Sequence, residues 1–256
     1  MANTRPIEKG DSMRNLLLGA AFLAAAGATP AHATLQIAAD INGASFFCSN
    51  GMACDQNSNP NVIITNNATL DGILFSSSSA SSASGSLNFL NASNLLITNT
   101  NATPVDVTIT VSNTGFTAPV KNFNDASSGV WQGPSGVSTA TFKWFIDPAN
   151  AQGADTAFDT PGVQVDSSAS TSVGPVLSFS RNNASIVDAL DAPFSMTEQV
   201  TLHLAAGESL VNRGQTIVGA AVPEPSTWAM FGLGFGLIAF MGFKRSRNRD
   251  RLASFA

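Results

Sequence analysis

The sequence predicts an all-β domain, an antiparallel β-sandwich of jelly-roll or immunoglobulin-like type, held between two targeting segments. Ser, Thr, Asn, Gly and Val dominate the central part of the chain, and its apolar residues come in short alternating runs between turn residues. The runs recur about every 10 to 25 residues without helical periods between them, a spacing typical of packed antiparallel sheets. This central part, residues 34–221, is long enough for one domain with its own core.

Nine runs are expected to form strands. The strongest is 105–113, where four β-branched residues at alternate positions would face one way and Asp and Thr residues would face the other. In 140–147 the same alternation would place Phe142 and Trp144 on one face and Lys143 and Phe145 on the other. The other expected strands are 35–39, 61–65, 72–76, 87–90, 94–98, 173–180 and 199–205.

Two stretches of the central domain lack a clear strand pattern. The serine-rich stretch 76–86 is of low complexity, and we expect a mobile loop or a polar strand there rather than a glycosylated stalk. Only 185–190 has a local helical pattern, and it is short. A sandwich therefore accounts for the central domain without a helical layer.

The N-terminal segment has the three parts of a secretory signal peptide. Arg14 precedes the apolar run 16–26, and Ala31 and Ala33 supply a small-residue cleavage site. Residues 1–33 are therefore expected to be removed on export, with cleavage after Ala33. The polar residues 1–12 would be an upstream extension, which leaves two candidate start residues, Met1 and Met13.

The C-terminal segment predicts a transmembrane helix. Residues 228–243 form a run of about 16 residues without a charge, roughly 24 Å as a helix, against a hydrocarbon core of ~30 Å. Extension to 227–243 and snorkelling of the following basic side chains would let it span a bilayer. A buried helix in a soluble core is the alternative, which the basic cluster disfavours. That cluster within 244–251 would stay in the cytoplasm and consists of Lys244, Arg245, Arg247, Arg249 and Arg251.

A short motif of Pro223, Glu224 and Pro225 precedes this helix. The motif, the apolar helix and the basic tail together span 222–256 and resemble the PEP-CTERM sorting signal of exported proteins in Gram-negative bacteria. The resemblance implies Sec-type export and processing by an exosortase, a membrane-embedded transpeptidase-like protease thought to cut at the motif. The protein would then cross the inner membrane transiently and end in the periplasm, on the cell surface or outside the cell. An ordinary pair of prolines before a helix is the alternative, and the extension 252–256 departs from the pattern.

The net charge of the central domain excludes some classes of binding partner. Residues 34–224 contain four basic residues against eleven aspartates and three glutamates, a net charge of −10. A domain this acidic, without a basic stripe, is a poor candidate for binding nucleic acid or anionic membrane surfaces. No nucleic acid is therefore expected as a partner.

Cys48 and Cys54 are expected to form a disulfide. They are the only cysteines, they lie close together in an exported chain, and Asn50-Gly51 between them is a turn dipeptide. A metal-binding pair is the weaker alternative, because His203 is the only histidine left after signal cleavage. His203 lies in the middle of an expected strand and is interpreted as a structural residue.

Catalytic, metal and cofactor sites are not predicted. A catalytic triad would need His203, and no serine has the G-x-S-x-G surroundings. A glycosidase site with two carboxylates is an open alternative, because the sequence does not show which carboxylates lie close together in the fold. The stretch 55–60 imitates the start of a calcium loop but lacks the glycine and the glutamate of an EF-hand, and looser binding at loop aspartates such as Asp155 and Asp159 stays open.

Two function classes follow. The first is a non-catalytic surface or matrix protein of an extracellular polysaccharide or biofilm system, which the PEP-CTERM resemblance favours. The second is a carbohydrate-binding module or hydrolase, for which Trp131 and Trp144 would supply a sugar-stacking platform. Burial of both tryptophans would remove the sequence support for the second class.

Overall fold

The structure is a computed structural model that describes residues 34–84, 87–117, 120–134, 136–190 and 193–221, together with Leu233 and Phe235. The chain divides into two units, Met1–Ala33 and Thr34–Ala256. The expected signal peptide, sorting motif and basic tail lie outside the described residues. Leu233 and Phe235 are helical and exposed. Within the described part of the chain, no helix reaches the length and apolarity needed to span a membrane.

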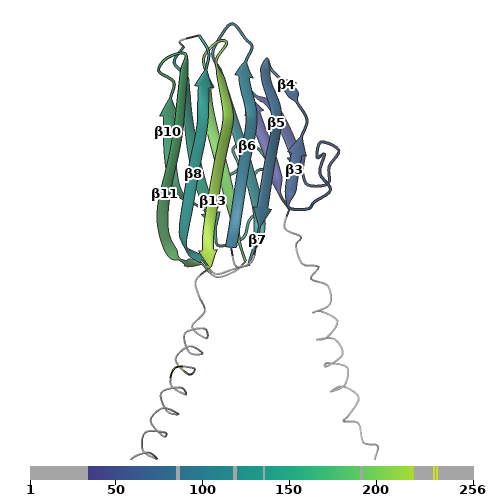
Figure 1. The fold of residues 1–256 in the computed structure, drawn as a ribbon. Helices are drawn as coiled ribbons and strands as arrows, with labels where there is room; N and C mark the ends of the chain where they lie inside the picture. The colour runs from purple at the N-terminus through teal and green to yellow at the C-terminus, as the bar shows by residue number, and fades with distance from the viewer. Residues whose placement is uncertain are drawn as a thin grey trace, which may run out of the picture. The chain divides into compact units, whose positions relative to one another are not determined.

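The described domain consists of two antiparallel β-sheets that face each other, as the sequence predicts (Figure 1). Sheet A has the strand order β10-β9-β12-β7-β1-β2 and sheet B the order β11-β8-β13-β6-β5-β3, with β4 paired to β5. The strands of sheet A are β1 (Gln36–Ile41), β2 (Ala44–Ser49), β7 (Val105–Phe116), β9 (Thr139–Asp147), β10 (Val163–Thr171) and β12 (Phe194–Leu204). Those of sheet B are β3 (Val62–Thr65), β4 (Ala68–Leu70), β5 (Ile73–Ala83), β6 (Leu87–Asn99), β8 (Val120–Gln132), β11 (Val176–Leu190) and β13 (Ser209–Ala221).

The chain passes from one sheet to the other at nearly every connection after β6. Strands β6, β8, β11 and β13 belong to sheet B, and β7, β9, β10 and β12 belong to sheet A. Only the connection from β9 to β10 stays within one sheet. Strands β1 to β5 extend the two sheets along one edge, and this is the edge where the candidate pocket lies.

Alternating side chains build the core between the sheets. In β7 the residues Val105, Val107, Ile109 and Val111 are buried, and in β9 Phe142 and Trp144 are buried with them. The facing strand β8 contributes Phe123 and Trp131, both 0% exposed. The two alternations expected from sequence are thus confirmed. Burying aromatic and branched side chains at roughly 25 cal/mol per Å² holds the two sheets together.

The structure corrects the helical expectation for 185–190. These residues belong to β11, which pairs with β8 along most of its length, including Ser185 with Phe123. Pairing in the sheet therefore overrides the local helical pattern. The serine-rich stretch is a polar strand as far as Ala83, because it forms most of β5.

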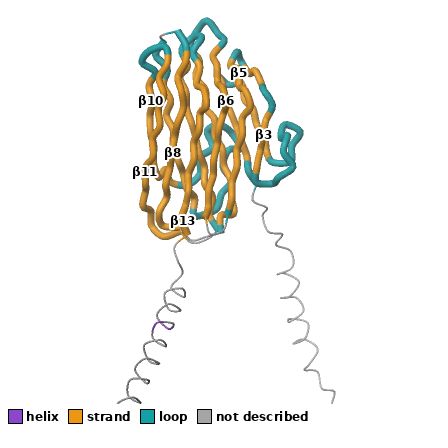
Figure 2. Tube along the Cα trace, in the orientation of Figure 1, coloured by secondary structure: helices purple, strands orange, loops and turns teal. Residues whose placement is uncertain are grey.

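A long loop, 148–162, lies against the outer face of sheet A. The Ala157 carbonyl accepts hydrogen bonds from the side chains of Thr110 and Gln199, and the Gly153 amide donates to Ser112. Thr110, Ser112 and Gln199 point away from the core, yet the loop keeps them at most 8% exposed. Sheet A is therefore covered here on both faces. A second loop, between β2 and β3, projects beside β3 (Figure 2).

Candidate functional site

A cavity opens between the two sheets at the edge formed by β1 to β5. Its volume is about 160 Å³. Strands β1, β2 and β7 of sheet A and strands β3, β4, β5 and β6 of sheet B contribute its walls. The lining residues are Ile37, Ala39, Ser45, Phe46, Thr65, Asn66, Ala68, Thr69, Leu70, Phe75, Ser78, Asn94 and Ile109.

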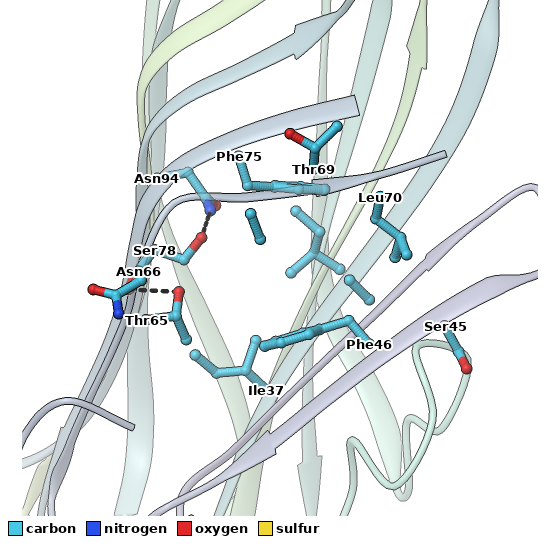
Figure 3. Close-up of a pocket in the computed structure, with 13 residues that line it drawn as sticks. Ile37, Ser45, Phe46, Thr65, Asn66, Thr69, Leu70, Phe75, Ser78 and Asn94 are labelled. Atoms are coloured by element: carbon cyan, nitrogen blue, oxygen red, sulfur yellow. Dashed lines mark hydrogen bonds between the residues drawn. The ribbon is translucent and has the colours of Figure 1, made fainter. Parts of the chain in front are cut away.

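Two phenylalanines form opposite walls of this pocket. Phe46 comes from β2 and Phe75 from β5, and they lie on opposite sides of the cavity (Figure 3). Phe75 is 8% exposed, and Phe46 is partly buried against the core. With Ile37, Leu70 and Ile109, they make the pocket mostly apolar.

Most of the labelled polar side chains gather at one end of the pocket (Figure 3). Thr65 donates to the Ser78 carbonyl at 3.3 Å, and the Asn94 amide donates to the Ser78 hydroxyl. Asn94 also accepts a hydrogen bond from Arg213 at 2.6 Å. Because these groups already bond one another, a ligand here need not supply a hydrogen bond. An apolar cavity of similar size, about 150 Å³, is known to bind benzene. The pocket is therefore suited to a small apolar molecule or group.

Behind Asn94 lies a charged pair inside the core. Arg213 of β13 is 2% exposed and Glu198 of β12 is 1% exposed, so both side chains lie between the sheets. Arg213 donates to Asn94 and, at 3.1 Å, to Gln215. Burial raises the pKa of Glu198 well above its usual value, and the charge of Arg213 and the Ile217 amide oppose that shift. Neither carboxylate oxygen has a hydrogen bond of normal geometry.

Burial likewise lowers the pKa of Arg213 to about 10, although the charge of Glu198 opposes this. The guanidinium therefore stays charged at neutral pH. Its positive charge, on β13 of sheet B, lowers the pKa of Glu198 on β12 of sheet A and so partly offsets the effect of burial. This pair was not foreseen, since Glu198 and Arg213 are 15 positions apart in sequence and lie in strands without a charge pattern.

Paired carboxyl groups do occur, at the opposite edge of the sandwich. Asp125 of β8 and Asp166 of β10 share a hydrogen bond, and the neighbouring hydroxyls of Ser127 and Ser168 lie 2.9 Å apart. Burial, then the hydrogen bond and charge of Asp166, raises the pKa of Asp125 to about 7. Partial burial acts in the same direction on Asp166, but hydrogen bonds, foremost from Asn183, lower its pKa below the usual value.

This carboxyl pair differs from a glycosidase site in its geometry. Glycosidase carboxyl groups stand about 5 to 9.5 Å apart, so that the glycosidic bond fits between them. Asp125 and Asp166 are in direct contact, and Asp125 is 3% exposed between the sheets. The pair therefore closes the edge between β8 and β10.

Both tryptophans of the proposed sugar platform are buried. Trp131 is 0% and Trp144 is 1% exposed, and the Trp131 ring donates to Ser170 at 3.0 Å. Trp144 belongs to the core together with Phe142. A stacking surface made of these two rings does not form, so the carbohydrate-binding class loses its support from sequence.

The remaining candidates have structural contacts. Cys48 and Cys54 form the expected disulfide, with their Cα atoms 6.0 Å apart. His203 Nδ1 lies 2.7 Å from Asp106 on the exposed face of sheet A. In the calcium-like stretch, Asp55 accepts hydrogen bonds from backbone amides, including those of Gly51 and Ile64. Across the described residues, no three His, Cys, Asp or Glu side chains are grouped to hold a metal ion.

Comparison with known proteins identifies the C-terminal segment. A family model for the PEP-CTERM protein-sorting motif matches residues 221–246, beginning at the last residue of β13. The chain therefore carries the sorting motif of an exosortase substrate, as the resemblance implies. No curated protein matches the chain significantly.

Several solved structures are weakly similar to this chain. TmCBM61 in complex with beta-1,4-galactotriose is 10% identical, with a TM-score of 0.27 over 54% of this chain and 85% of that chain. The CBM22-1 xylan-binding domain from Paenibacillus barcinonensis Xyn10C is 15% identical, with a TM-score of 0.26 over 64% and 88%. The adhesin domain of Epf from Streptococcus pyogenes is 9% identical, with a TM-score of 0.30 over 74% and 60%. At TM-scores this low, the similarity carries no argument about function.

Proposed function

We propose that this chain is an exported, non-catalytic surface or matrix protein, which an exosortase sorts and processes and which works with extracellular polysaccharide. The observation that carries the proposal is the sorting motif at 221–246, directly after the last strand of the β-sandwich. The motif implies export and an exosortase as processing partner. A disulfide close to the start of the domain supports an oxidising destination.

We infer a two-signal route for this protein. Residues 1–33 direct it through the Sec-type machinery, and the segment 227–243 holds it in the inner membrane until cleavage near Pro223, Glu224 and Pro225 releases it. The prolines fix their backbone φ angles and lack amide hydrogens, so they keep the motif outside the helix. The Glu224 carboxylate then offers the enzyme one charged feature to recognise.

We further infer that the domain is a jelly roll rather than an immunoglobulin-like sandwich. The last eight strands alternate between the sheets, with one in-sheet hairpin from β9 to β10. Two four-stranded sheets, β11-β8-β13-β6 and β10-β9-β12-β7, result from this path. That arrangement supports a jelly roll, in which two Greek keys fold together.

A second candidate function is binding of a small apolar molecule in the pocket between Phe46 and Phe75. The apolar walls and the internally bonded polar end favour such a ligand over a sugar, whose hydroxyl groups need polar partners. The carbohydrate-binding alternative would therefore need another surface.

Replacement of the motif tests the main proposal. Exchanging Pro223, Glu224 and Pro225 for alanine leaves the apolar run and basic tail intact, so membrane insertion should persist while release stops. Cell fractionation with an antibody to the domain should find the variant in the inner membrane and the unchanged protein outside it. Release of the variant at the normal rate would overturn exosortase processing at this motif.

A further inference from the structure

The outer face of sheet B carries no charged side chain among those that the structure describes. We call this surface, formed by the outward residues of β11, β8, β13, β6 and β5, the neutral face (Figure 1). One row across it reads Ser180, Ser128, Gly214, Ser93 and Ser79. Figure 1 looks onto this face, and no described segment crosses it.

The absence of charge is unusual for so acidic a domain. The described acidic side chains lie on loops, on sheet A or between the sheets, as Asp155, Asp106 and Glu198 illustrate. Depletion of charged residues is one compositional feature of the centre of protein interfaces. Copies of a domain with this excess of acid repel one another least when they approach through uncharged surfaces.

The polar groups of the neutral face bond to one another across the strands. The hydroxyls of Ser79 and Ser93 lie 2.7 Å apart, and Thr216 donates to Asn91 at 2.8 Å. Polar groups that already have partners can lose water at little cost, whereas unpaired groups cannot. The neighbouring row adds the apolar side chains of Val130, Val211 and Leu96.

The size of the neutral face fits a stable interface. Five strands spaced about 4.8 Å apart, over about five outward residues each, cover roughly 24 by 30 Å. That is on the order of 700 Å², close to the ~800 Å² per partner of a standard interface. The outer face of sheet A differs, because the loop 148–162 covers part of it and the exposed charged side chain of Asp106 lies on another part.

We propose that two copies of this chain associate through the neutral face, sheet B against sheet B, as a two-fold symmetric dimer. Stacked sheets pack about 10 Å apart, and the small serine, glycine and alanine side chains in the centre permit such close approach. The proposal goes beyond the sorting route and does not depend on it, because it rests on the surface of the folded domain.

Sedimentation velocity of the full chain in detergent, over a concentration series, tests this proposal. The wild-type protein should become dimeric as its concentration rises. Asn124→Glu places a charge on the neutral face at an exposed position, so the dissociation constant should rise at least tenfold. Thr216→Glu, nearer the centre, should do the same. Thr201→Glu is the matched control, since Thr201 is exposed on the outer face of sheet A, and its dissociation constant should equal that of the wild type.

Each other outcome would overturn the dimer. A wild-type protein that stays monomeric up to millimolar concentration has no such interface. A dimer that Asn124→Glu leaves intact uses a different surface. A monomer that pellets with an insoluble neutral glycan, and loses this property in Asn124→Glu, would show that the neutral face binds a polymer instead of a second copy. Circular dichroism of each variant, compared with the wild type, establishes that the fold is retained.

Discussion

At the scale of single residues, the most consequential side chains are the charges that the sandwich buries. Arg213 and Glu198 lie between the sheets at 2% and 1% exposure, and the Asn94 side chain connects Arg213 to the pocket wall. Removing one member of a buried pair leaves the other charge without compensation. Substituting either residue should therefore change the free energy of unfolding more than substituting an exposed residue does.

Arg213→Met should lower the free energy of unfolding by about 3–5 kcal/mol, because Glu198 would lose the positive charge that opposes the cost of burying its carboxyl group. The double variant Arg213→Met, Glu198→Leu should recover most of that loss. Urea denaturation measures both, with Arg181→Met as a control, since Arg181 is exposed and should change stability by about 0.5 kcal/mol at most. A single variant as stable as the wild type would contradict the buried pair.

Asp125 makes stability depend on pH. Its pKa is raised from 3.8 to about 7 in the folded state, so the folded protein binds more protons than the unfolded chain between these values. The free energy of unfolding should therefore fall as pH rises from about 4 to 7, with a slope of up to about 1.4 kcal/mol per pH unit. The lowered pKa of Asp166 acts in the opposite direction and only below that range.

Asp125→Asn should reduce this slope by the contribution of Asp125, because the amide does not titrate, while the raised pKa of Glu198 keeps its own contribution. Ser127→Ala is the matched control: it removes the adjacent contact between β8 and β10 but no titrating group, so the slope should persist. Urea denaturation of the wild type and both variants at each pH measures the slope. An equal slope in wild type and Asp125→Asn would show that the carboxyl pair is not responsible.

At the scale of elements, the sequence predicted the strands whose apolar residues alternate. Strands β7 and β9 lie where the Val-Ile and Phe-Trp alternations place them. Strands β8 and β13 were missed, because small polar residues fill their outward positions and Gly129, Gly214 and Gly219 interrupt the pattern. Their identity as strands comes from pairing with neighbours that are distant in sequence, which no local pattern reveals.

The pocket was missed for a related reason. Its two phenylalanines lie in β2 and β5, and only the β5 segment was expected as a strand, over 72–76. The run Ala-Ser-Phe-Phe-Cys-Ser of β2 was a detectable signal for a strand next to the disulfide. The meeting of these two strands across the sandwich edge depends on the topology of the sheets, and alternation within one strand cannot show it.

Filling the pocket should abolish binding of a small apolar probe. Benzene at tenfold its dissociation constant should stabilise the wild-type protein by about 1.4 kcal/mol and raise its Tm. Ala39→Leu adds apolar atoms to the lining and should eliminate this shift. Ala184→Leu, at an exposed position of β11, should retain it. A wild-type Tm that benzene does not change would contradict a ligand-accessible pocket.

At the scale of the whole molecule, the C-terminal motif indicates how the chain is sorted, and the β-sandwich forms its folded domain. The C-terminal motif could be read from sequence because three ordered features, the Pro-Glu-Pro motif, the apolar run and the basic tail, occur together, and the family model matches there. The fold class followed from strand alternation. The neutral face and the buried charges could not be read in advance, because they depend on which strands become neighbours.

The central claim is that an exosortase removes the C-terminal segment of an exported protein. Mass spectrometry of the protein recovered outside the inner membrane tests it most directly. The account predicts a chain that starts at Thr34 and ends near Pro223–Pro225, without peptides from 228–256. Intact peptides from 228–256 on protein outside the inner membrane would show that the segment is not removed, and would contradict the account.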